Sequence, residues 1–471
     1  MKLGSIDIES TMKETRRLIK ENPNMSPSVR SSLELLMLLV TLLINRLGLN
    51  SRNSSKPPSS DPNRKKKINK PNSKKAGGQE GHIGTNLKKV EKPDVIKNIP
   101  VDRSVLPEGE YKEVGYEARQ VLDIKISQVV TEYRAQILEN SKGKQYIASF
   151  PKHINRPIQY GVNLKSLSVY LSQHQLTPYN RIEDIFEDQA EIPISAGTIY
   201  NFNEEAYTKL ELFESIVKSK LRDSKVCHAD ETGINVNGKR KWLHCVSNKD
   251  WTYFMPHEKR GMDAINAMGI LPEFKGVLCH DHWRPYFKLE CKHSLCNAHH
   301  IRELERAWEQ DQQKWAKELK SLLLEINKDV NNRGGFLSFQ KASEYRRLYR
   351  ELLEKASDEC PAPNPEDRKN KKGPMKRSTS RNLLERLIEY ENEVLRFMED
   401  KIVPFTNNQA ENDIRMTKVQ QKISGCFRSF QGAYIFCRVR SYISTCRKNG
   451  VTASSALKLL FKGKLPHFLG I

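Results

Sequence analysis

A long stretch near the N-terminus cannot join any hydrophobic core, and this divides the chain before any other feature is considered. Residues 51–99 are dominated by Pro, Gly, Ser, Asn and Lys, and almost none of them could be buried. A segment of this composition buries too little apolar surface to offset the entropy lost on ordering. The sequence therefore predicts a disordered basic linker at 51–99, with a short segment before it and a larger folded part after it.

The linker carries part of a large positive charge. The formal net charge of the chain is +22. Lys and Arg gain affinity for nucleic acids by displacing counterions from phosphates, so this charge predicts a polyanionic partner. Charge alone also fits a soluble basic protein without such a partner. The linker lysines expected to hold the phosphate backbone without reading its sequence are Lys65, Lys66, Lys67, Lys74 and Lys75.

Residues 1–50 are predicted to be a helical segment. The apolar run "LLMLLVTLLI" at 35–44 is about half the length of a membrane-spanning helix. Its apolar residues instead follow a near-heptad pattern, which favours a helix that buries one face. That face could contact a second copy of the chain or its own domain. The residues of this stripe are Leu33, Leu36, Leu39, Val40 and Leu43.

The N-terminus and the cysteines point to the cytoplasm. The opening "MKLGSIDIESTMKETRRLIKENP" lacks the apolar centre of a signal peptide. The 9 cysteines include no C-x-x-C pair, and an odd number without a disulfide framework indicates reduced thiols. We therefore expect a cytoplasmic protein with no membrane partner.

A chain of 471 residues is too long for one typical domain, so several are expected. Residues 100–155 are predicted to be a small β-rich segment, since "ARQVLDIKI" and "SQVVTEYRAQIL" alternate in polarity and "ENSKGKQ" is a turn before "YIASF". Residues 156–222 are predicted to be helical. The helices around "YNRIEDIFEDQ" and "AGTIYNFNEEAYTKL" are separated by "EIPIS", with Ser195 as an N-cap. This pattern is typical of a helix-turn-helix that binds DNA, although many helical hairpins bind nothing.

The second half of the chain alternates between strands and helices, which predicts an α/β fold. Residues 223–304 contain four expected strands, in "KVCHADETGI", "KRKWLHCVSN", "WTYFMPHEK" and "GVLCHDHW", and Asn237-Gly238 predicts a hairpin turn between the first two. Residues 305–388 are predicted to be mainly helical and end in a basic, Pro-containing break. Residues 389–471 are predicted to be helical.

Three carboxylates in this half could meet at one point. Asp230 closes the run "KVCHAD" and Asp281 closes "GVLCHD", so both are expected at the ends of neighbouring strands. Glu411 lies in "NNQAENDIR", on a predicted helix. A surface charge is the usual role of any single carboxylate, but this ordered set favours a shared site. Carboxylate oxygens prefer Mg²⁺ or Mn²⁺, and two such ions can promote phosphodiester transfer.

The helix around Glu411 brings further polar residues to this site. Thr406 or Asn407 is expected to cap it. Asn408, Glu411 and Arg415 are spaced at i, i+3 and i+7, so they share one face. The basic residues expected to hold DNA phosphates here are Arg415, Lys418, Lys422 and Arg428.

Several motifs, taken in order, resemble the DDE transposases of the insertion-sequence-66 family. They are "SSKPPSSDPNRKKK", "HADETG", "HDHWRPY", "SLCNAHHIREL", "NNQAENDIR" and "FRSFQGAYIFCRVRSYISTCRKNG". The resemblance covers nearly the whole chain. It implies an RNase H-like catalytic domain that is interrupted by the helical insertion at 305–388. It also implies that Asp230, Asp281 and Glu411 are the catalytic, metal-binding triad, with Cys296 and His299 as supporting residues.

The resemblance further implies metal-dependent cleavage and strand transfer at the ends of a bacterial insertion sequence. The expected partners are terminal inverted repeats, target DNA, further copies of the chain and accessory transposition proteins, and DNA binding would place the protein on the nucleoid. Two alternatives remain. One is a catalytically inactive end-binder or repressor derived from a transposase. The other is an RNase H-like nuclease that cleaves structured nucleic acid without preference for element ends.

One feature departs from the family pattern. Members commonly carry a cysteine-pair zinc ribbon before the helix-turn-helix. Residues 91–226 contain no cysteine, so the 100–155 segment, which occupies the position of the ribbon, lacks the cysteines that would bind zinc. Cys291, His293, Cys296 and His299 could form a zinc site, but their spacing is not that of a standard finger and zinc is not expected. Trp283 is the best candidate for stacking on a DNA base.

Overall fold

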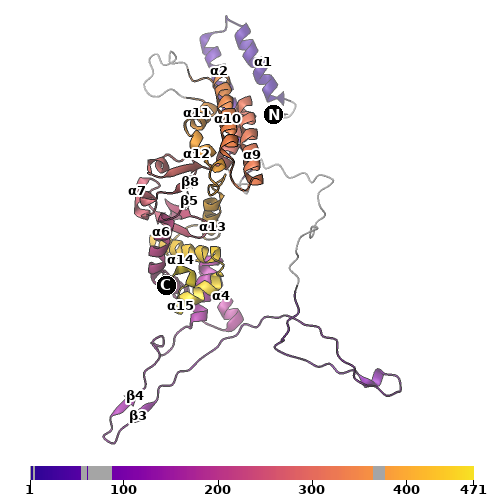
Figure 1. Cartoon of the computed structure of the whole chain (residues 1–471), viewed down its shortest axis with the longest axis vertical. Helices are drawn as coiled ribbons and strands as arrows, with labels where there is room; N and C mark the ends of the chain where they lie inside the picture. Colours follow the sequence, from indigo (N-terminus) through magenta and orange to yellow (C-terminus); the bar gives the residue numbers. More distant parts are fainter. Residues whose placement is uncertain (1, 4–5, 55–60, 62–86, 364–376, 471) are drawn as a thin grey trace. The chain divides into compact units, whose positions relative to one another are not determined.

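The computed structural model describes residues 2–3, 6–54, 61, 87–363 and 377–470 (Figure 1). The five linker lysines predicted to bind DNA (Lys65, Lys66, Lys67, Lys74 and Lys75) lie outside the described residues. The chain divides into two units. One comprises Met1–Arg64, Ser149–Asp184 and Ile194–Ile471, and the other comprises Lys65–Ala148 and Ile185–Pro193.

The N-terminal segment is helical, as predicted. Two short strands, β1 (Lys2–Leu3) and β2 (Ile6–Asp7), precede helices α1 (Ile8–Glu21) and α2 (Pro27–Leu47). The hydroxyl of Ser26 caps α2, and a proline at its first position suits the fixed φ of a helix start.

Helix α2 is longer than the apolar run at 35–44, which by itself is about half the length of a membrane-spanning helix. With 21 residues it is long and apolar enough to cross a membrane by length and composition alone, and none of its apolar window is buried. Within the predicted stripe Leu33 is partly buried, while Leu36, Leu39, Val40 and Leu43 are exposed. In the single chain, the helix therefore leaves most of the stripe without a partner.

The segment at 100–155 contains much less β-structure than predicted. Its strands are a hairpin of β3 (Ile137–Glu139) and β4 (Gln145–Ile147), joined at the predicted turn. No strand forms at 118–136, where Val121, Ile124 and Val129 are exposed. The prediction was wrong there because alternating residues form a stable strand only when a neighbouring strand pairs with them and one face is buried.

In the sequence, helices follow this segment and precede the first strand of the main sheet. They are α3 (Val162–Val169), which continues as a π-helix at Tyr170–His174, then α4 (Tyr179–Ala190), α5 (Ala196–Lys209) and α6 (Glu211–Arg222). Ser195 is the N-cap of α5, as predicted, and its hydroxyl accepts the N–H of Thr198.

The core of the first unit is a five-stranded sheet with the order β7-β6-β5-β8-β9. The pairs β5–β6 and β6–β7 are antiparallel, whereas β5–β8 and β8–β9 are parallel. The Asn237-Gly238 turn has positive φ at both residues, which the predicted hairpin requires. The strands are β5 (Val226–Val236), β6 (Lys239–Ser247), β7 (Thr252–His257), β8 (Val277–His280) and β9 (Lys292–Leu295).

The helices after the sheet strands form two groups. The short α7 (Met262–Met268) lies between β7 and β8 in the chain. The first group contains α8 (Asn297–Asp311), which begins before the predicted insertion boundary at 305, and the insertion helices α9 (Lys314–Asn332), α10 (Phe339–Glu359) and α11 (Thr379–Glu389). The C-terminal part contains α12 (Glu391–Leu395), α13 (Asn408–Ser424), α14 (Phe430–Lys448) and α15 (Ala453–Phe461). Figure 1 shows the sheet between the insertion helices α9–α11 and the C-terminal helices α14 and α15.

Alternation along the central strand assigns its residues to different cores. Cys227 and Ala229 of β5 pack in one core with residues of α6 and α14. Ile234 and Val236 pack in another, against α13 and the start of α14. Helix α14 also covers the open edge of β7, where the hydroxyl of Ser441 accepts the backbone N–H of Phe254. Covering this edge blocks pairing with another chain, and it fixes α14 and α13 relative to the sheet.

Candidate active site

Asp230 and Asp281 come together through the pairing of two parallel strands. β5 pairs with β8 up to the register His228↔Cys279, so Asp230 and Asp281 each follow the last paired residues by two positions, and the charge of Asp281 acts on Asp230. β8 ends one residue before Asp281, so this carboxylate is at a strand end, as predicted. Asp230 is not, because β5 continues to Val236. It lies instead where β5 has ceased to pair with β8.

Both aspartates are in an environment that disfavours their charge. Burial, followed by the negative charges of Glu231 and Asp281, raises the pKa of Asp230 to about 8. Burial, followed by the charge of Glu231, raises the pKa of Asp281 to about 6. The charge of Glu411 adds to both increases, so its carboxylate is near enough to act on each of them. Carboxyl groups held together in this way are costly unless a cation neutralises them.

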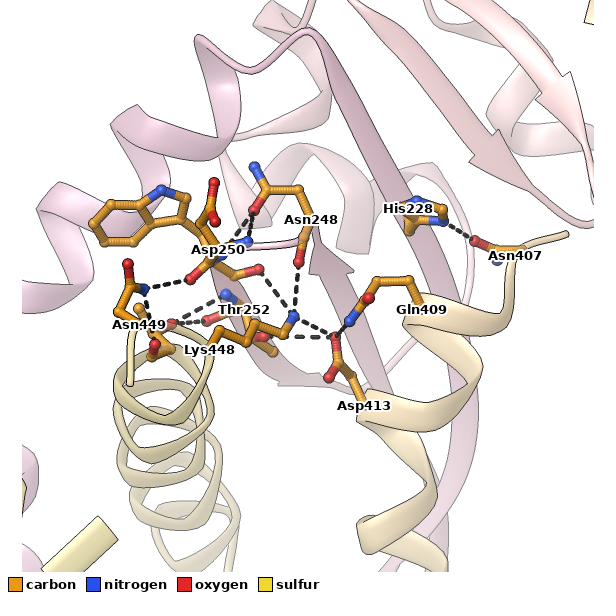
Figure 2. Close-up of polar contacts among 11 residues, drawn as sticks. His228, Asn248, Asp250, Thr252, Asn407, Gln409, Asp413, Lys448 and Asn449 are labelled. Atoms are coloured by element: carbon orange, nitrogen blue, oxygen red, sulfur yellow. Dashed lines mark hydrogen bonds and ion pairs between the residues drawn. The ribbon is translucent and has the colours of Figure 1, made fainter. Parts of the chain in front are cut away.

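The helix that carries Glu411 is attached to β5 by the residue that precedes it. Asn407 is the N-cap of α13, one of the two predicted positions, but its side chain does not cap the helix. Its amide nitrogen donates to the carbonyl oxygen of Ala229 at 2.8 Å. Its Oδ1 is 2.8 Å from Nδ1 of His228, a contact that Figure 2 shows. These bonds fix the first turn of α13 beside Asp230.

A buried ion pair fixes the next turn of α13. Nζ of Lys448, from the end of α14, is 2.7 Å from Oδ2 of Asp413, and each side chain is 13% exposed. Figure 2 shows that Lys448 also donates to the carbonyl oxygen of Asn248, between β6 and β7, and that Gln409 donates to Asp413. The pair therefore connects α13, α14 and the sheet on one side of Glu411.

Cys296 and His299 lie beside Glu411. Cys296 precedes α8, and its buried thiol accepts the backbone N–H of Asn407 at 3.1 Å. Its Sγ is 3.8 Å from Oε1 of Glu411, and Nδ1 of His299 is also 3.8 Å from this oxygen. Nδ1 of His299 is buried and has no hydrogen-bond partner among the described residues. Both residues predicted to support the site thus contact the predicted third carboxylate.

Sequence reasoning missed a cluster next to Asp230. The side chain of Glu231 is 1% exposed, accepts from Nε of Arg260 at 2.8 Å and accepts from the hydroxyl of Tyr286 at 2.7 Å. The guanidinium of Arg260 lies 4.9 Å from the ring centre of Trp242 and 4.6 Å from that of Trp283. Trp283, the predicted stacking residue, therefore already stacks on a cation of the protein. The partners of Glu231 are far apart in the chain, so no local pattern could reveal them.

A basic groove opens beside Asp230. Lys418 of α13 donates to the carbonyl oxygen of Gly233 at 3.0 Å. Burial and the charge of Arg240 lower the pKa of Lys418, while the charge of Asp230 opposes this, so all three charges are close. The groove has a volume of about 410 Å³, and its lining residues are Gly233, Ile234, Asn235, Gly238, Arg240, Lys418, Gln421 and Gly425.

The remaining predicted site residues are at the surface. Asn408 and Arg415 are exposed on α13, as is Lys422, and Arg428 is exposed in the loop that follows. Arg415, Lys418 and Lys422 are spaced at i, i+3 and i+7, so this helix presents a basic face that begins near Glu411.

Residues 157–435 match the Transposase IS66 family. The match covers more than half of the 471 residues of the chain. The chain belongs to the IS66 family of transposases. A second match, over residues 8–88, is to a family of unknown function (DUF6444). A comparison with curated proteins finds no match.

Membership gives this IS66 transposase a role in transposition and makes DNA the molecule on which it acts. The matched range contains the three carboxylates, Cys296, His299 and the basic groove. It ends within α14, so Lys448 and the last helix lie outside it.

Proposed function

We propose that this IS66 transposase cleaves DNA at the ends of its element and joins them to a target by a DDE mechanism. The reactions are metal-dependent phosphodiester hydrolysis and transesterification, with Asp230, Asp281 and Glu411 as the metal ligands. One observation carries the proposal. Burial and the charge of Glu231 raise the pKa of Asp230 and Asp281, and the charge of Glu411 on α13 adds to both increases, so the three carboxylates lie near one another.

The donor set fits Mg²⁺ or Mn²⁺. Carboxylate oxygens are hard ligands, and a site that disfavours free carboxylate charge gains most when a dication is present. Two such ions, when bound, would supply an activated water or 3′-hydroxyl and stabilise the leaving oxygen. The chain itself positions Glu411 through Asn407 and the Asp413–Lys448 pair.

The sheet supports an RNase H-like layout for the catalytic domain. Three antiparallel strands are followed by two parallel ones, and the helical insertion enters after β9. The proposed organisation keeps the predicted boundaries: helical segment 1–50, linker 51–99, small segment 100–155, helix-turn-helix-like region 156–222, catalytic core 223–304 and 389–471, and insertion 305–388.

The basic residues near the site suggest how DNA is held. Arg240 and Lys418 line a groove beside Asp230, and Arg415, Lys422 and Arg428 extend the positive charge along α13 and past its end. Lys and Arg at such positions contact phosphates and add affinity without sequence preference. Recognition of the terminal repeats is assigned to the α4–α5 region, with Ser195 starting its second helix.

The exposed stripe of α2 suggests how copies of the chain associate. Leu36, Val40 and Leu43 recur with the 4- and 3-residue spacing of a coiled coil and are exposed in the single chain. We assign homo-oligomer contacts to this face, in a cytoplasmic protein that acts on the nucleoid with accessory transposition proteins.

The function is tested with DNA that carries the inverted repeats flanking the gene. The wild-type protein should nick this DNA at the repeat ends in Mg²⁺ and not in chelator, and should leave DNA without the repeats intact. Stable binding to the repeats without Mg²⁺-dependent nicking would indicate an inactive end-binder. Cleavage of structured nucleic acid irrespective of the repeats would indicate a nuclease of another kind.

A further inference from the structure

We propose that Cys296, His299 and Glu411 form a binding site for a thiophilic divalent cation of the zinc class. Their ligand atoms all lie within 4.8 Å of one another, and they form the one group of this kind among the residues that the structure describes. The binding of this cation goes beyond the proposed catalytic function. Its consequence for catalysis rests on that function, because Glu411 belongs to both sites.

The distances suit a tetrahedral ion. Ligand bonds of 2.0–2.3 Å at tetrahedral angles place ligand atoms roughly 3.3–3.5 Å apart. Sγ of Cys296 and Nδ1 of His299 are each 3.8 Å from Oε1 of Glu411. The ligand atoms of Cys296 and His299 lie within 4.8 Å of each other, so side-chain movements of up to about 1 Å would complete three corners and leave the fourth open to water.

The surroundings of the two softer ligands suit a metal. Nδ1 of His299 is buried without a hydrogen-bond partner among the described residues, so a lone pair is available there at no cost in existing bonds. The backbone N–H of Asn407 points at the sulfur of Cys296, and such outer contacts orient a thiolate ligand. Binding displaces the thiol proton of Cys296 to solvent, and the new metal–sulfur bond offsets this loss.

The rival set suggested by the sequence does not assemble. Cys296 and His299 were considered there together with Cys291 and His293. Nδ1 of His293 is instead 3.0 Å from Nε2 of His280, and its Nε2 is 3.3 Å from the carbonyl oxygen of Leu289. The third ligand comes from Glu411, more than a hundred residues later, which no sequence spacing indicates.

The two sites would compete for one carboxylate. Sulfur and imidazole ligands favour Zn²⁺ strongly over Mg²⁺, whereas an all-carboxylate site does not exclude Mg²⁺. An ion held by Cys296 and His299 therefore draws Glu411 away from Asp230 and Asp281. We expect low concentrations of Zn²⁺ to inhibit Mg²⁺-dependent cleavage by the wild-type protein.

The first test measures binding without reference to cleavage. Full-length, metal-free protein is titrated with Co²⁺, whose absorption reports a thiolate ligand and tetrahedral geometry, and with Zn²⁺ against a chromogenic chelator. The wild type should bind one ion per chain with a sulfur-to-cobalt charge-transfer band. Cys296→Ser should lose this band, and both Cys296→Ser and His299→Gln should bind Zn²⁺ at least 10-fold more weakly.

Cys426→Ser is the matched control, since Cys426 is a partly exposed free thiol outside the group. It should keep both the band and the affinity, and circular dichroism checks that each variant is folded. His299→Gln guards against a folding defect, because the side chain of His299 is 30% exposed. A spectrum without a thiolate band, or equal loss in Cys426→Ser, would overturn the proposal. Wild-type cleavage with no Zn²⁺ binding would overturn this site and leave the proposed function standing.

Discussion

Replacing Lys448 by Met should loosen the helix that carries Glu411. Nζ of Lys448 contacts Oδ2 of Asp413 at 2.7 Å and donates to the carbonyl oxygen of Asn248. Met keeps most of the apolar stem and removes the charge. Asp413 is then left with Gln409 and Thr252 as donors and with no cation.

The size of the effect follows from burial. Removing one partner of a buried ion pair costs about 3–5 kcal/mol, because the remaining charge is left unpaired. Both side chains are 13% exposed, so some water reaches them and the lower end, about 3 kcal/mol, is the better value. If the loss is local to α13, it corresponds to roughly 100-fold faster amide exchange in that helix.

Hydrogen–deuterium exchange of peptides from 408–424 measures this directly. The control is Asp263→Asn, which removes an exposed pair with Lys259 at the same distance of 2.7 Å and should leave exchange unchanged. Adding Asp413→Asn to Lys448→Met should recover part of the loss, because no charge is then left unpaired. Exchange in α13 of Lys448→Met within about 3-fold of wild type would refute the reasoning.

Three further predictions concern other parts of the chain. The double variant Arg240→Ala, Lys418→Ala should weaken DNA binding equally for all sequences. It should also reduce the slope of log affinity against log salt by about 1 for each phosphate that the protein no longer neutralises. An unchanged slope would contradict the proposal that the groove binds phosphates. Burial lowers the pKa of His244 to about 4, so the stability that its neutral form gives above pH 6.5 should be lost as the pH falls to 4. Over this interval the thermal midpoint of His244→Gln should fall less than that of the wild type. Equal falls in the two proteins would contradict the lowered pKa of His244. Leu36→Glu should reduce the sedimenting mass to that of a monomer, whereas Leu38→Glu, on the other side of α2, should not; equal effects would argue against the stripe.

Local sequence signals were enough to predict parts of the main sheet and the start of one helix. The Asn237-Gly238 turn, the strands around it and the cap at Ser195 depend on neighbouring residues, and each is where it was predicted. The strands expected at 118–136 failed because alternation does not supply a pairing strand. Whether a short alternating run becomes a strand depends on contacts that are distant in sequence.

In the candidate site, too, some features could be predicted from local sequence and others could not. The three carboxylates could be proposed from the order of their motifs, but their surroundings could not. Thr406 or Asn407 was expected to cap α13; Asn407 is the N-cap residue, but its side chain contacts β5 at Ala229 instead of capping the helix. The ion pair of the buried Glu231 with the partly exposed Arg260 joins residues 29 positions apart, and Glu411 contacts Cys296 across 115 positions. Only the folded sheet brings such residues together.

Strand cleavage by single carboxamide variants is the most direct test of the proposed active site. Asp230→Asn, Asp281→Asn and Glu411→Gln are compared with wild type and with Glu290→Gln, which alters an exposed carboxylate, on DNA carrying the element ends in Mg²⁺. We predict that each of the three variants binds this DNA nearly as well as wild type and does not cleave it, whereas Glu290→Gln cleaves normally. Cleavage at the wild-type rate by any of the three would contradict the proposed active site.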